Sequence, residues 1–331
     1  MRRLSKFIKI VIKVLIVIFA IWGFVLTVIF FAMKFGLTKS KGYIDNQSQY
    51  FKKLLNNAEN GNDERSNIAV KDFEYIKNLE EWKVISLGIE KDKNIIERVA
   101  KETNINARLI ITPLVAEQLR LMTSEREIFK RYFQPLAVLG TQTQFSLGIY
   151  GIKEATAKEI ERNLKNPNSQ YYLGEKYSHL LDYSTNSESL LVDAFTLEVV
   201  KDNKISSTAN TIYTNISTST NTEYKDTILL EGNDAERVRR LTKEKDHYYS
   251  YLYAAIYLKQ IETAWKNAGF SISNRPEIIA TLYNIGFNNS HPNIDPKVGG
   301  AEINLYGKKY SFGAIAFYFY FSCNFICTSP N

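Results

Sequence analysis

The longest strongly apolar run of the chain lies near the N-terminus and has the sequence VLIVIFAIWGFVLTVIFFAM, positions 14–33, with no charged residue. A helix rises about 1.5 Å per residue, so about 20 residues cross the ~30 Å hydrocarbon core of a bilayer. We therefore expect one transmembrane helix that contacts the lipid bilayer through residues 14–33. The apolar segment AIAFYFYFSCNFIC near the C-terminus is shorter, and we expect it to form a buried helix.

Beyond residue 68, apolar residues recur at three- and four-residue spacing, which is typical of helices with one buried face. The segments VKDFEYIKNLEEWKVIS, NIIERVAKET and LIITPLVAEQLRLM carry this pattern. Pro113 lies inside the third segment, where it either kinks the helix or marks its first turn. The pattern therefore predicts a mainly α fold. Further helices are expected at 156–164, 234–245, 247–269 and 276–285.

One segment departs from the helical pattern. Residues 203–227, NKISSTANTIYTNISTSTNTEYKDT, are rich in Ser, Thr and Asn and contain a few β-favouring residues at Ile212, Tyr213 and Ile216. We expect a solvated polar loop or small hairpin inserted between helices. A flap over a substrate groove is the alternative interpretation.

The charge of the chain is unevenly distributed. Its 331 residues include 42 Lys plus Arg against 35 Asp plus Glu, a net charge of +7. Eight of the basic residues lie within residues 1–41, which contain no acidic residue, so the remainder has 34 basic against 35 acidic residues. A domain without excess positive charge cannot release the counterions of a phosphate backbone, which excludes a nucleic-acid partner. The two cysteines, Cys323 and Cys327, exclude a disulfide-dense scaffold, and we assign them no function.

The basic residues also predict a topology. Five precede the apolar run and three follow it, which favours a cytoplasmic N-terminus and a C-terminal domain outside the cytoplasmic (inner) membrane. A cleaved signal peptide is the alternative, but the run is long and MKFGLTKSKG offers no A-x-A cleavage pattern. We thus expect a cytoplasmic tail and single-pass signal anchor at 1–41, a polar juxtamembrane stalk at 42–67 and one domain at 68–331.

Three segments carry candidate chemistry. Glu117 ends the apolar stretch LIITPLVAE, and a carboxyl desolvated by such neighbours suits a general acid, although a solvated helix edge is the plainer interpretation. SLGIYGIKEATA, residues 146–157, has two glycines that permit a tight turn before a helix. TLYNIGFN, residues 281–288, offers a hydroxyl, a carboxamide and an aromatic face, or alternatively a helix that ends at a glycine cap.

The order of these segments resembles the lysozyme-like superfamily in its goose-type and lytic transglycosylase form. In that family a catalytic Glu ends an apolar helix, a segment of the type S-x-G-L-M-Q-I-x-P-x-T-A follows, and a later A-Y-N-A-G segment lines the cleft. The resemblance covers roughly Ile95 to Ser322 and implies a lysozyme-like helical domain. The matching positions here are Glu117, then Ser146, Gly148, Ile149, Ile152, Thr156 and Ala157, then Tyr283, Asn284 and Gly286.

The chain departs from the family pattern in three ways. Gly151 stands where the family has Gln, and Glu154 stands where it has Pro. The stretch between the Glu and the Ser is longer than usual and contains Glu125 and Glu127, either of which is an alternative acid. Insertions between residues 165 and 246 make this a divergent member.

The resemblance implies cleavage of the β-1,4 bond between N-acetylmuramic acid and N-acetylglucosamine in peptidoglycan, with Glu117 as general acid and base. The motif segments supply no convincing second carboxylate. Single-acid members of the family are thought to use the acetamido group of the substrate and then to close a 1,6-anhydro ring, which makes them lytic transglycosylases; hydrolysis would instead make the enzyme a muramidase.

The family pattern also implies substrate contacts. Tyr283 and Asn284 would orient the muramoyl sugar, and the backbone from Ser146 to Gly148 would hold its neighbour. Tyr310, among small residues near the C-terminus, offers a further aromatic face for a sugar ring. The chain has no HExxH motif and no glycine-rich phosphate loop, so we expect neither metal nor cofactor. The alternative function is a weak or inactive glycan-binding scaffold among the proteins of an envelope assembly.

Overall fold

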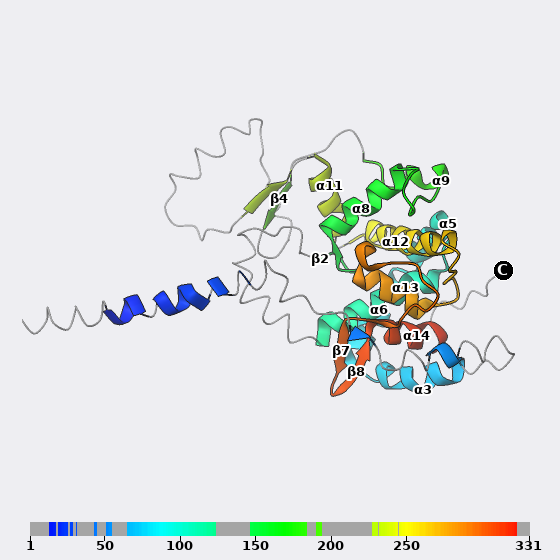
Figure 1. The fold of residues 1–331 in the computed structure, drawn as a ribbon, viewed down its shortest axis with the longest axis horizontal. Coiled ribbons are helices and arrows are strands. Elements are labelled where there is room, and N and C mark those ends of the chain that lie inside the picture. Colours follow the sequence, from blue (N-terminus) through cyan, green and yellow to red (C-terminus); the bar gives the residue numbers. More distant parts are fainter. Residues whose placement is uncertain are drawn as a thin grey trace, which may run out of the picture. The chain divides into compact units, whose positions relative to one another are not determined.

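The computed structural model describes residues 13–17, 19–25, 27–28, 31, 43–44, 51–54, 65–123, 146–183, 190–193, 227–230, 232–243 and 245–322. The chain divides into two compact units, Met1–Lys41 and Gly42–Asn331. The second unit is mainly helical, which confirms the prediction of a mainly α fold (Figure 1). Among the described residues its helices are α3 (Arg65–Lys77), α4 (Glu80–Lys91), α5 (Lys93–Thr103), α6 (Ala107–Thr123), α8 (Glu154–Lys165), α9 (Glu175–Ser178), α11 (Gly232–Leu241), α12 (Tyr248–Asn267), α13 (Pro276–Ile285) and α14 (Phe312–Ser322), together with the 3₁₀ turn η3 (Phe287–Asn289).

The strands in the described part of the chain are short and form four separate antiparallel pairs, β1 with β6, β2 with β3, β4 with β5 and β7 with β8. They connect or cap helices and do not build a sheet layer (Figure 1). The strands are β1 (Tyr43–Ile44), β2 (Ser146–Leu147), β3 (Ile152–Lys153), β4 (Leu190–Asp193), β5 (Thr227–Leu230), β6 (Gly299–Gly300), β7 (Glu302–Leu305) and β8 (Lys308–Ser311).

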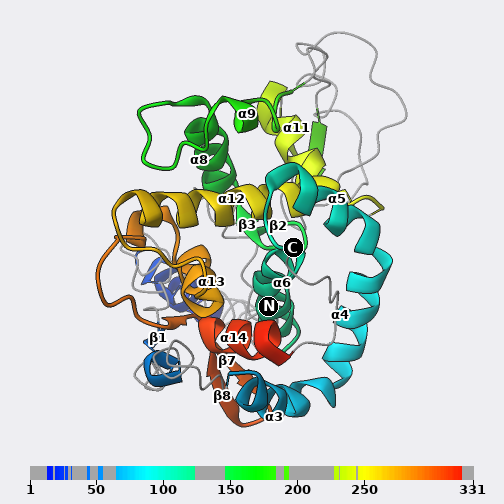
Figure 2. The same cartoon turned by 90° about the vertical axis from the view of Figure 1, so that its right-hand side faces the viewer.

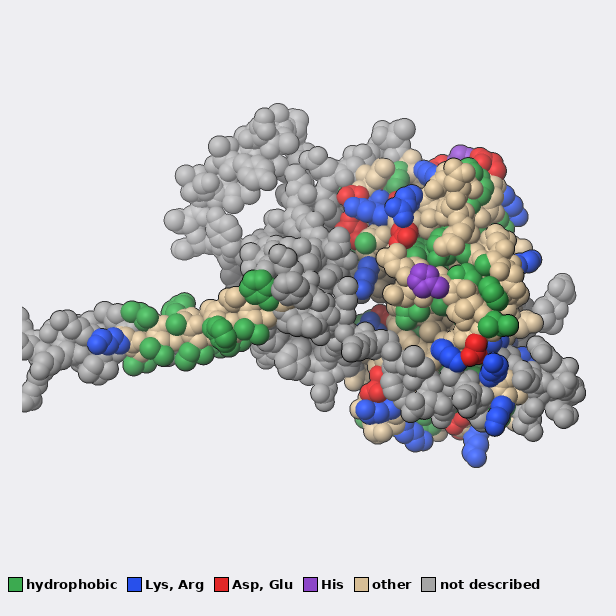
Figure 3. All heavy atoms as spheres, in the orientation of Figure 1, with side chains coloured by type: hydrophobic (Ala, Val, Ile, Leu, Met, Phe, Trp, Pro, Cys, Tyr) green, Lys and Arg blue, Asp and Glu red, His purple; other side chains and the backbone are tan. Residues whose placement is uncertain are grey.

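The first unit contains the apolar run at 14–33. Its described positions are helical, and apolar side chains such as Phe19 and Phe24 are 76% and 70% exposed. These side chains cover the helix in green in Figure 3. Positions 18, 26, 29, 30, 32 and 33 of the run lie outside the described residues. Among the residues that are described, no helix has both the length and the apolar character that a membrane crossing requires.

The segment at 42–67, predicted as a separate stalk, contributes to the second unit at its described positions. β1 pairs with β6, and the helical residues 51–54 place Phe51 in the core with no exposed surface. The Phe51 ring lies 4.8 Å from that of Phe317 in α14. At these positions the stalk prediction is wrong, because burial of Phe51 against an aromatic helix outweighs the polar composition of the surrounding sequence.

Two helices form the centre of the domain. α12 crosses it (Figure 2), and most of its side chains are buried, in keeping with apolar residues around its whole circumference. α14 has the sequence FGAIAFYFYFS, is buried on nearly all sides and packs against α3, α6 and α13. This confirms the buried terminal helix for residues up to Ser322. Cys323 and Cys327 lie outside the described residues.

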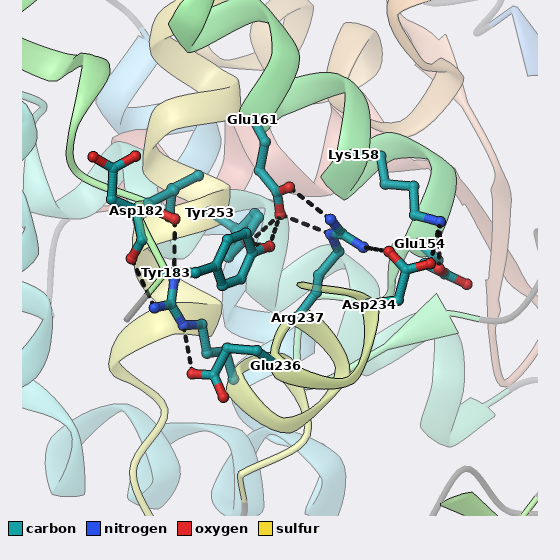
Figure 4. Close-up of polar contacts among 11 residues, drawn as sticks. Glu154, Lys158, Glu161, Asp182, Tyr183, Asp234, Glu236, Arg237 and Tyr253 are labelled. Atoms are coloured by element: carbon teal, nitrogen blue, oxygen red, sulfur yellow. Dashed lines mark hydrogen bonds and ion pairs between the residues drawn. The ribbon is translucent and has the colours of Figure 1, made fainter. Parts of the chain in front are cut away.

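A buried polar network joins α8, α11 and α12 (Figure 4). Oε1 of Glu161 accepts hydrogen bonds from Arg237 Nε (2.7 Å), from the Tyr253 hydroxyl (2.5 Å) and from the Tyr183 hydroxyl, while Oε2 accepts from Arg237 Nη2 (2.7 Å). Arg237 also pairs with Asp234 at 2.6 Å. The carboxylate is thus fully satisfied, so this cluster is structural and does not present a reactive group.

The network also fixes the base of the polar insertion. Tyr183 precedes the insertion and Arg237 follows it, and both bind Glu161 of α8. Between them, β4 and β5 pair in antiparallel register from Leu190 opposite Leu230 to Asp193 opposite Thr227. Residues 203–226 of the predicted loop or hairpin lie outside the described residues, so its tip stays a prediction.

Glu277 on α13 has no exposed surface. Its Oε1 accepts from Arg275 Nε at 2.5 Å, whereas its Oε2 has no hydrogen-bond partner within the described structure. Burial raises the pKa of the Glu277 carboxyl above its ordinary value of 4.5, and the charge of Arg275 opposes this rise only in part. The folded protein therefore binds this proton more tightly than the unfolded chain does.

This raised pKa predicts a pH dependence of stability. Above pH 4.5 the unfolded chain loses the Glu277 proton first, so the free energy of unfolding falls as pH rises, by at most about 1.4 kcal/mol per pH unit for this group. Glu277→Gln removes this dependence. Urea denaturation of both proteins at pH 4.5 and pH 7 measures it, and an identical pH slope in the two would contradict the assignment.

Candidate active site

Glu117 lies on the buried face of α6, and only 4% of its surface is exposed. Every residue of α6 from Leu109 to Glu117 is buried, so the carboxylate is not at the solvated edge of the helix. Pro113 lies inside α6 and does not end it. Proline lacks the N–H that would donate to a carbonyl in the preceding turn of the helix. In that preceding turn, the carbonyl of Ile110 accepts a hydrogen bond from the Tyr150 hydroxyl at 2.8 Å.

A bidentate ion pair holds the Glu117 side chain. Arg120 lies three residues further along α6, and its Nη2 and Nε donate to Oε1 and Oε2 of Glu117 at 2.5 and 3.0 Å. Such a fork is the strong geometry for an arginine–carboxylate pair. Arg120 was not among the residues predicted from the sequence, although its spacing of three residues from Glu117 on a predicted helix indicates that the two side chains can meet.

The glycine-containing turn lies directly against this carboxylate. β2 and β3 are joined by residues 148–151, and the Gly151 N–H donates to the Gly148 carbonyl at 3.1 Å. Gly151 has φ +60°, and a Cβ at this position would lie 2.3 Å from Oε1 of Glu117. The absence of a side chain at Gly151 is therefore what leaves room for the carboxylate.

Two further contacts attach the turn to the helices. Gln118, next to Glu117, donates from Nε2 to the carbonyl of Ile149 at 2.5 Å. The hydroxyl of Tyr283 on α13 donates to the carbonyl of Tyr150 at 3.1 Å. The three sequence segments that carried candidate chemistry therefore meet at one place, even though they are far apart along the chain.

Tyr283 is buried beside the turn. It is 8% exposed, and its ring packs against those of Tyr257 at 5.1 Å and Phe312 at 6.4 Å. Burial raises the pKa of the Tyr283 hydroxyl well above its ordinary value, and the negative charge of Glu117 raises it further. The hydroxyl is thus a neutral hydrogen-bond donor at physiological pH.

A second polar cluster packs against the turn through the ring of Tyr150. Oδ2 of Asp92, between α4 and α5, accepts from the Tyr251 hydroxyl at 3.2 Å and lies 2.6 Å from Nδ1 of His247. The Tyr251 ring packs edge-on against Tyr150 at 5.5 Å. Sequence reasoning missed these residues, because Asp92 and His247 are 155 positions apart and carry no local motif.

The remaining predicted site residues have other described contacts. Oδ1 of Asn284 accepts from the Ala301 N–H at 2.8 Å and so connects the end of α13 to the bend between β6 and β7. Tyr310 is half-buried, its ring lies 6.1 Å from Tyr318 of α14, and burial raises its pKa with a smaller contribution from Asp72 of α3. The structure describes the backbone of Ser146 in β2 and nothing of its side chain.

Two alternatives from the sequence fall outside the described residues, since Glu125 and Glu127 lie between residues 123 and 146. A search of the described residues finds no group of three or more His, Cys, Asp or Glu side chains that could hold a metal ion. The chemistry of the described site is therefore that of one carboxylate, one guanidinium and one phenol.

Alanine at the two glycines of the turn is expected to lower the free energy of unfolding by different amounts. Gly148 has φ +65°, and a Cβ there would lie 2.2 Å from the backbone carbonyl oxygen of Leu241, which cannot move easily. We expect Gly148→Ala to lower the free energy of unfolding by about 2–5 kcal/mol, which combines left-handed strain with overpacking. At Gly151 the neighbour is the movable end of Glu117, so Gly151→Ala should cost about 1–2 kcal/mol and displace the carboxylate.

Gly269→Ala is the matched control for both variants. Gly269 follows α12 with φ +87° and has no atom within 4 Å of a built Cβ, so its substitution reports left-handed strain alone. Guanidinium denaturation of the three variants measures the costs. If Gly148→Ala and Gly269→Ala lowered the free energy of unfolding equally, the turn would not pack on Leu241 as described.

Comparisons with protein families, with curated proteins and with solved structures find no match to this chain.

Proposed function

We propose that this protein is a membrane-anchored peptidoglycan-cleaving enzyme, a lytic transglycosylase or muramidase, that breaks the β-1,4 bond between N-acetylmuramic acid and N-acetylglucosamine. One observation carries the proposal: Glu117 is buried where the 148–151 turn and Tyr283 meet. Those are the three segments on which the resemblance to the lysozyme-like superfamily rests, and an unrelated helical protein has no reason to gather them around a carboxylate.

In the proposed reaction Glu117 delivers a proton to the glycosidic oxygen as an oxocarbenium-like transition state develops. Both hydrogen-bond partners of the carboxylate in the described part of the chain are nitrogens of Arg120, and no second carboxylate takes part in them. The acetamido group of the substrate then replaces a protein nucleophile. Glu117, now ionised, removes the proton of the C6 hydroxyl as the 1,6-anhydro ring closes, or of water if the product is hydrolysed.

A second candidate function is a glycan-binding scaffold of an envelope assembly. The bidentate pair with Arg120 favours it, because both carboxylate oxygens of Glu117 are engaged by a protein guanidinium in the described structure. The glycine at position 151, where the family has a substrate-contacting amide, points the same way. A scaffold would bind peptidoglycan without releasing fragments of it.

The anchor at 14–33 places this activity outside the cytoplasmic membrane in the proposal. Its support is the length of the uncharged run and the exposed apolar side chains of its described helical positions. The described surface of the second unit carries charges of both signs, interspersed on the face that Figure 3 shows. A glycan strand, which is recognised through hydroxyl and amide groups, suits such a surface.

Mass spectrometry of the soluble products from purified sacculi tests the function. We expect the protein to release muropeptides, with 1,6-anhydromuramoyl ends from a transglycosylase or reducing ends from a muramidase. Sedimentation of the protein with sacculi in the absence of released muropeptides would instead favour the scaffold.

A further inference from the structure

Gln118 is a polar side chain of α6 that lies next to Glu117 in the chain and has no role toward substrate so far. Its Nε2 donates to the Ile149 carbonyl at 2.5 Å. Glu117 contacts the same turn two residues further on, where a Cβ at Gly151 would lie 2.3 Å from Oε1. Two successive side chains of α6 therefore contact the 148–151 turn, which holds both of them.

The carboxamide of Gln118 has an acceptor oxygen that is open to a ligand. Glu117 is 4% exposed, whereas Gln118 is partly exposed. Within the described structure the Gln118 side chain forms only the hydrogen bond to Ile149, so its Oε1 accepts from no described residue, and this oxygen is not sealed from solvent. By comparison, Oδ1 of Asn284 already accepts from the Ala301 N–H. Gln118 is thus held through its nitrogen and offers its oxygen to a donor.

The proposed reaction creates such a donor next to the general acid. The acetamido oxygen of the substrate bonds to C1 as the bond from C1 to the glycosidic oxygen breaks, and the glycosidic oxygen keeps the electron pair and takes the proton of the acid. Positive charge then develops on the acetamido group, so its N–H becomes a stronger hydrogen-bond donor. An acceptor that binds this N–H stabilises the transition state more than the ground state.

We propose that Gln118 is a substrate-binding residue whose Oε1 accepts a hydrogen bond from the acetamido N–H of the muramoyl sugar at the scissile bond. The inference rests on the proposed function and names the substrate group that the site selects, a secondary amide at C2. The turn itself cannot supply this acceptor from a side chain at position 151, because Glu117 occupies the space that such a side chain would need. The carboxamide therefore comes from α6.

A pair of matched substrates tests this assignment with the full-length protein in detergent. The first is a muramoyl-containing tetrasaccharide with its natural acetamido groups. The second carries an N-methylacetamido group on the muramoyl sugar at the scissile bond, which keeps the acetamido oxygen and removes the N–H. We expect the natural substrate to have the higher kcat/KM by at least about tenfold, the size expected when a hydrogen bond is lost and its acceptor is left unpaired. Equal kcat/KM values for the two substrates would overturn the proposal.

Two variants at position 118 separate the substrate contact from the contact with the turn. Gln118→Met and Gln118→Glu both lose the donor to the Ile149 carbonyl, but only the glutamate keeps an acceptor oxygen. We expect Gln118→Met to cleave the two substrates with kcat/KM values within about twofold of each other, and Gln118→Glu to keep a preference of at least about tenfold. A preference retained in Gln118→Met, or lost in both variants, would overturn the proposal.

Gln260→Met is the matched control. Gln260 on α12 is also a glutamine whose Nε2 donates to an isoleucine carbonyl, that of Ile160 at 3.0 Å, but it is fully buried and outside the site. Its substitution should leave the preference for the natural substrate unchanged, and a loss of the preference here would also overturn the proposal. If the wild-type protein cleaves neither substrate, the proposed function itself fails, which is a different result from cleavage of both at equal rates.

Discussion

Glu117→Gln is expected to lower the rate of peptidoglycan cleavage by at least about 100-fold, since general acid–base catalysis contributes roughly 10²–10⁴-fold. The carboxamide keeps the shape of the side chain and an acceptor for Arg120, but it has no acidic proton. The decrease in turbidity of a suspension of sacculi measures the rate.

Glu277→Gln provides the matched control. Glu277 is also a fully buried glutamate whose carboxylate accepts a hydrogen bond from an arginine, at 2.5 Å, and it takes no part in the proposed reaction. Its substitution should leave the rate unchanged. Full activity in Glu117→Gln, with a loss in Glu125→Gln or Glu127→Gln, would move the acid to the segment between α6 and β2.

Arg237→Gln is expected to lower the free energy of unfolding by about 3–5 kcal/mol, because it leaves the Glu161 carboxylate, whose side chain is only 12% exposed, without its cation. The Arg237 side chain is 5% exposed and forms three hydrogen bonds with Glu161 and Asp234. The two tyrosine hydroxyls on Glu161 remain, but they do not neutralise a charge in a poorly solvated position.

Arg239→Gln, two residues along the same helix, is the control for that variant. Arg239 pairs with Glu236 at the surface and its side chain is 57% exposed, so we expect a cost within about 1 kcal/mol. Urea denaturation of both variants gives the comparison. Costs of similar size would show that the network in Figure 4 does not hold the base of the insertion.

The helices were predictable from the sequence because their information is local. Periodic apolar residues predicted α6, α12 and α13 to within a few residues, and the uniformly apolar FGAIAFYFYFS predicted α14, which is buried on nearly all sides. The break between α3 and α4 was harder to predict. The periodic segment VKDFEYIKNLEEWKVIS forms two helices, which break at Asn78 and Leu79, and no Gly or Pro marks the break.

The candidate site was predictable in its parts and less so in its geometry. The sequence named Glu117, Gly148 and Tyr283 and the order in which they occur, while their meeting depends on tertiary contacts such as the hydrogen bond from Tyr283 to Tyr150. The role of Gly151 also changed. As a departure from a family motif it suggested a missing amide, whereas the described turn uses its lack of a side chain to admit the carboxylate.

The burial of Phe51 in the segment 42–67 could not be predicted from the sequence, because it also depends on tertiary contacts. Phe51 lies in the short segment YFKKLL within a largely polar stretch, and only the position of α14 in space explains why it is covered. A short apolar stretch in a polar segment is informative only once its partner is known.

The central claim is that Glu117 protonates a glycosidic oxygen, and a crystal structure of Glu117→Gln with a muramoyl-containing tetrasaccharide tests it most directly. We expect the side chain at position 117 within about 2.6–3.2 Å of the oxygen that links muramic acid to glucosamine. A bound sugar whose glycosidic oxygens all lie beyond reach of position 117, with Arg120 still covering that side chain, would contradict the account.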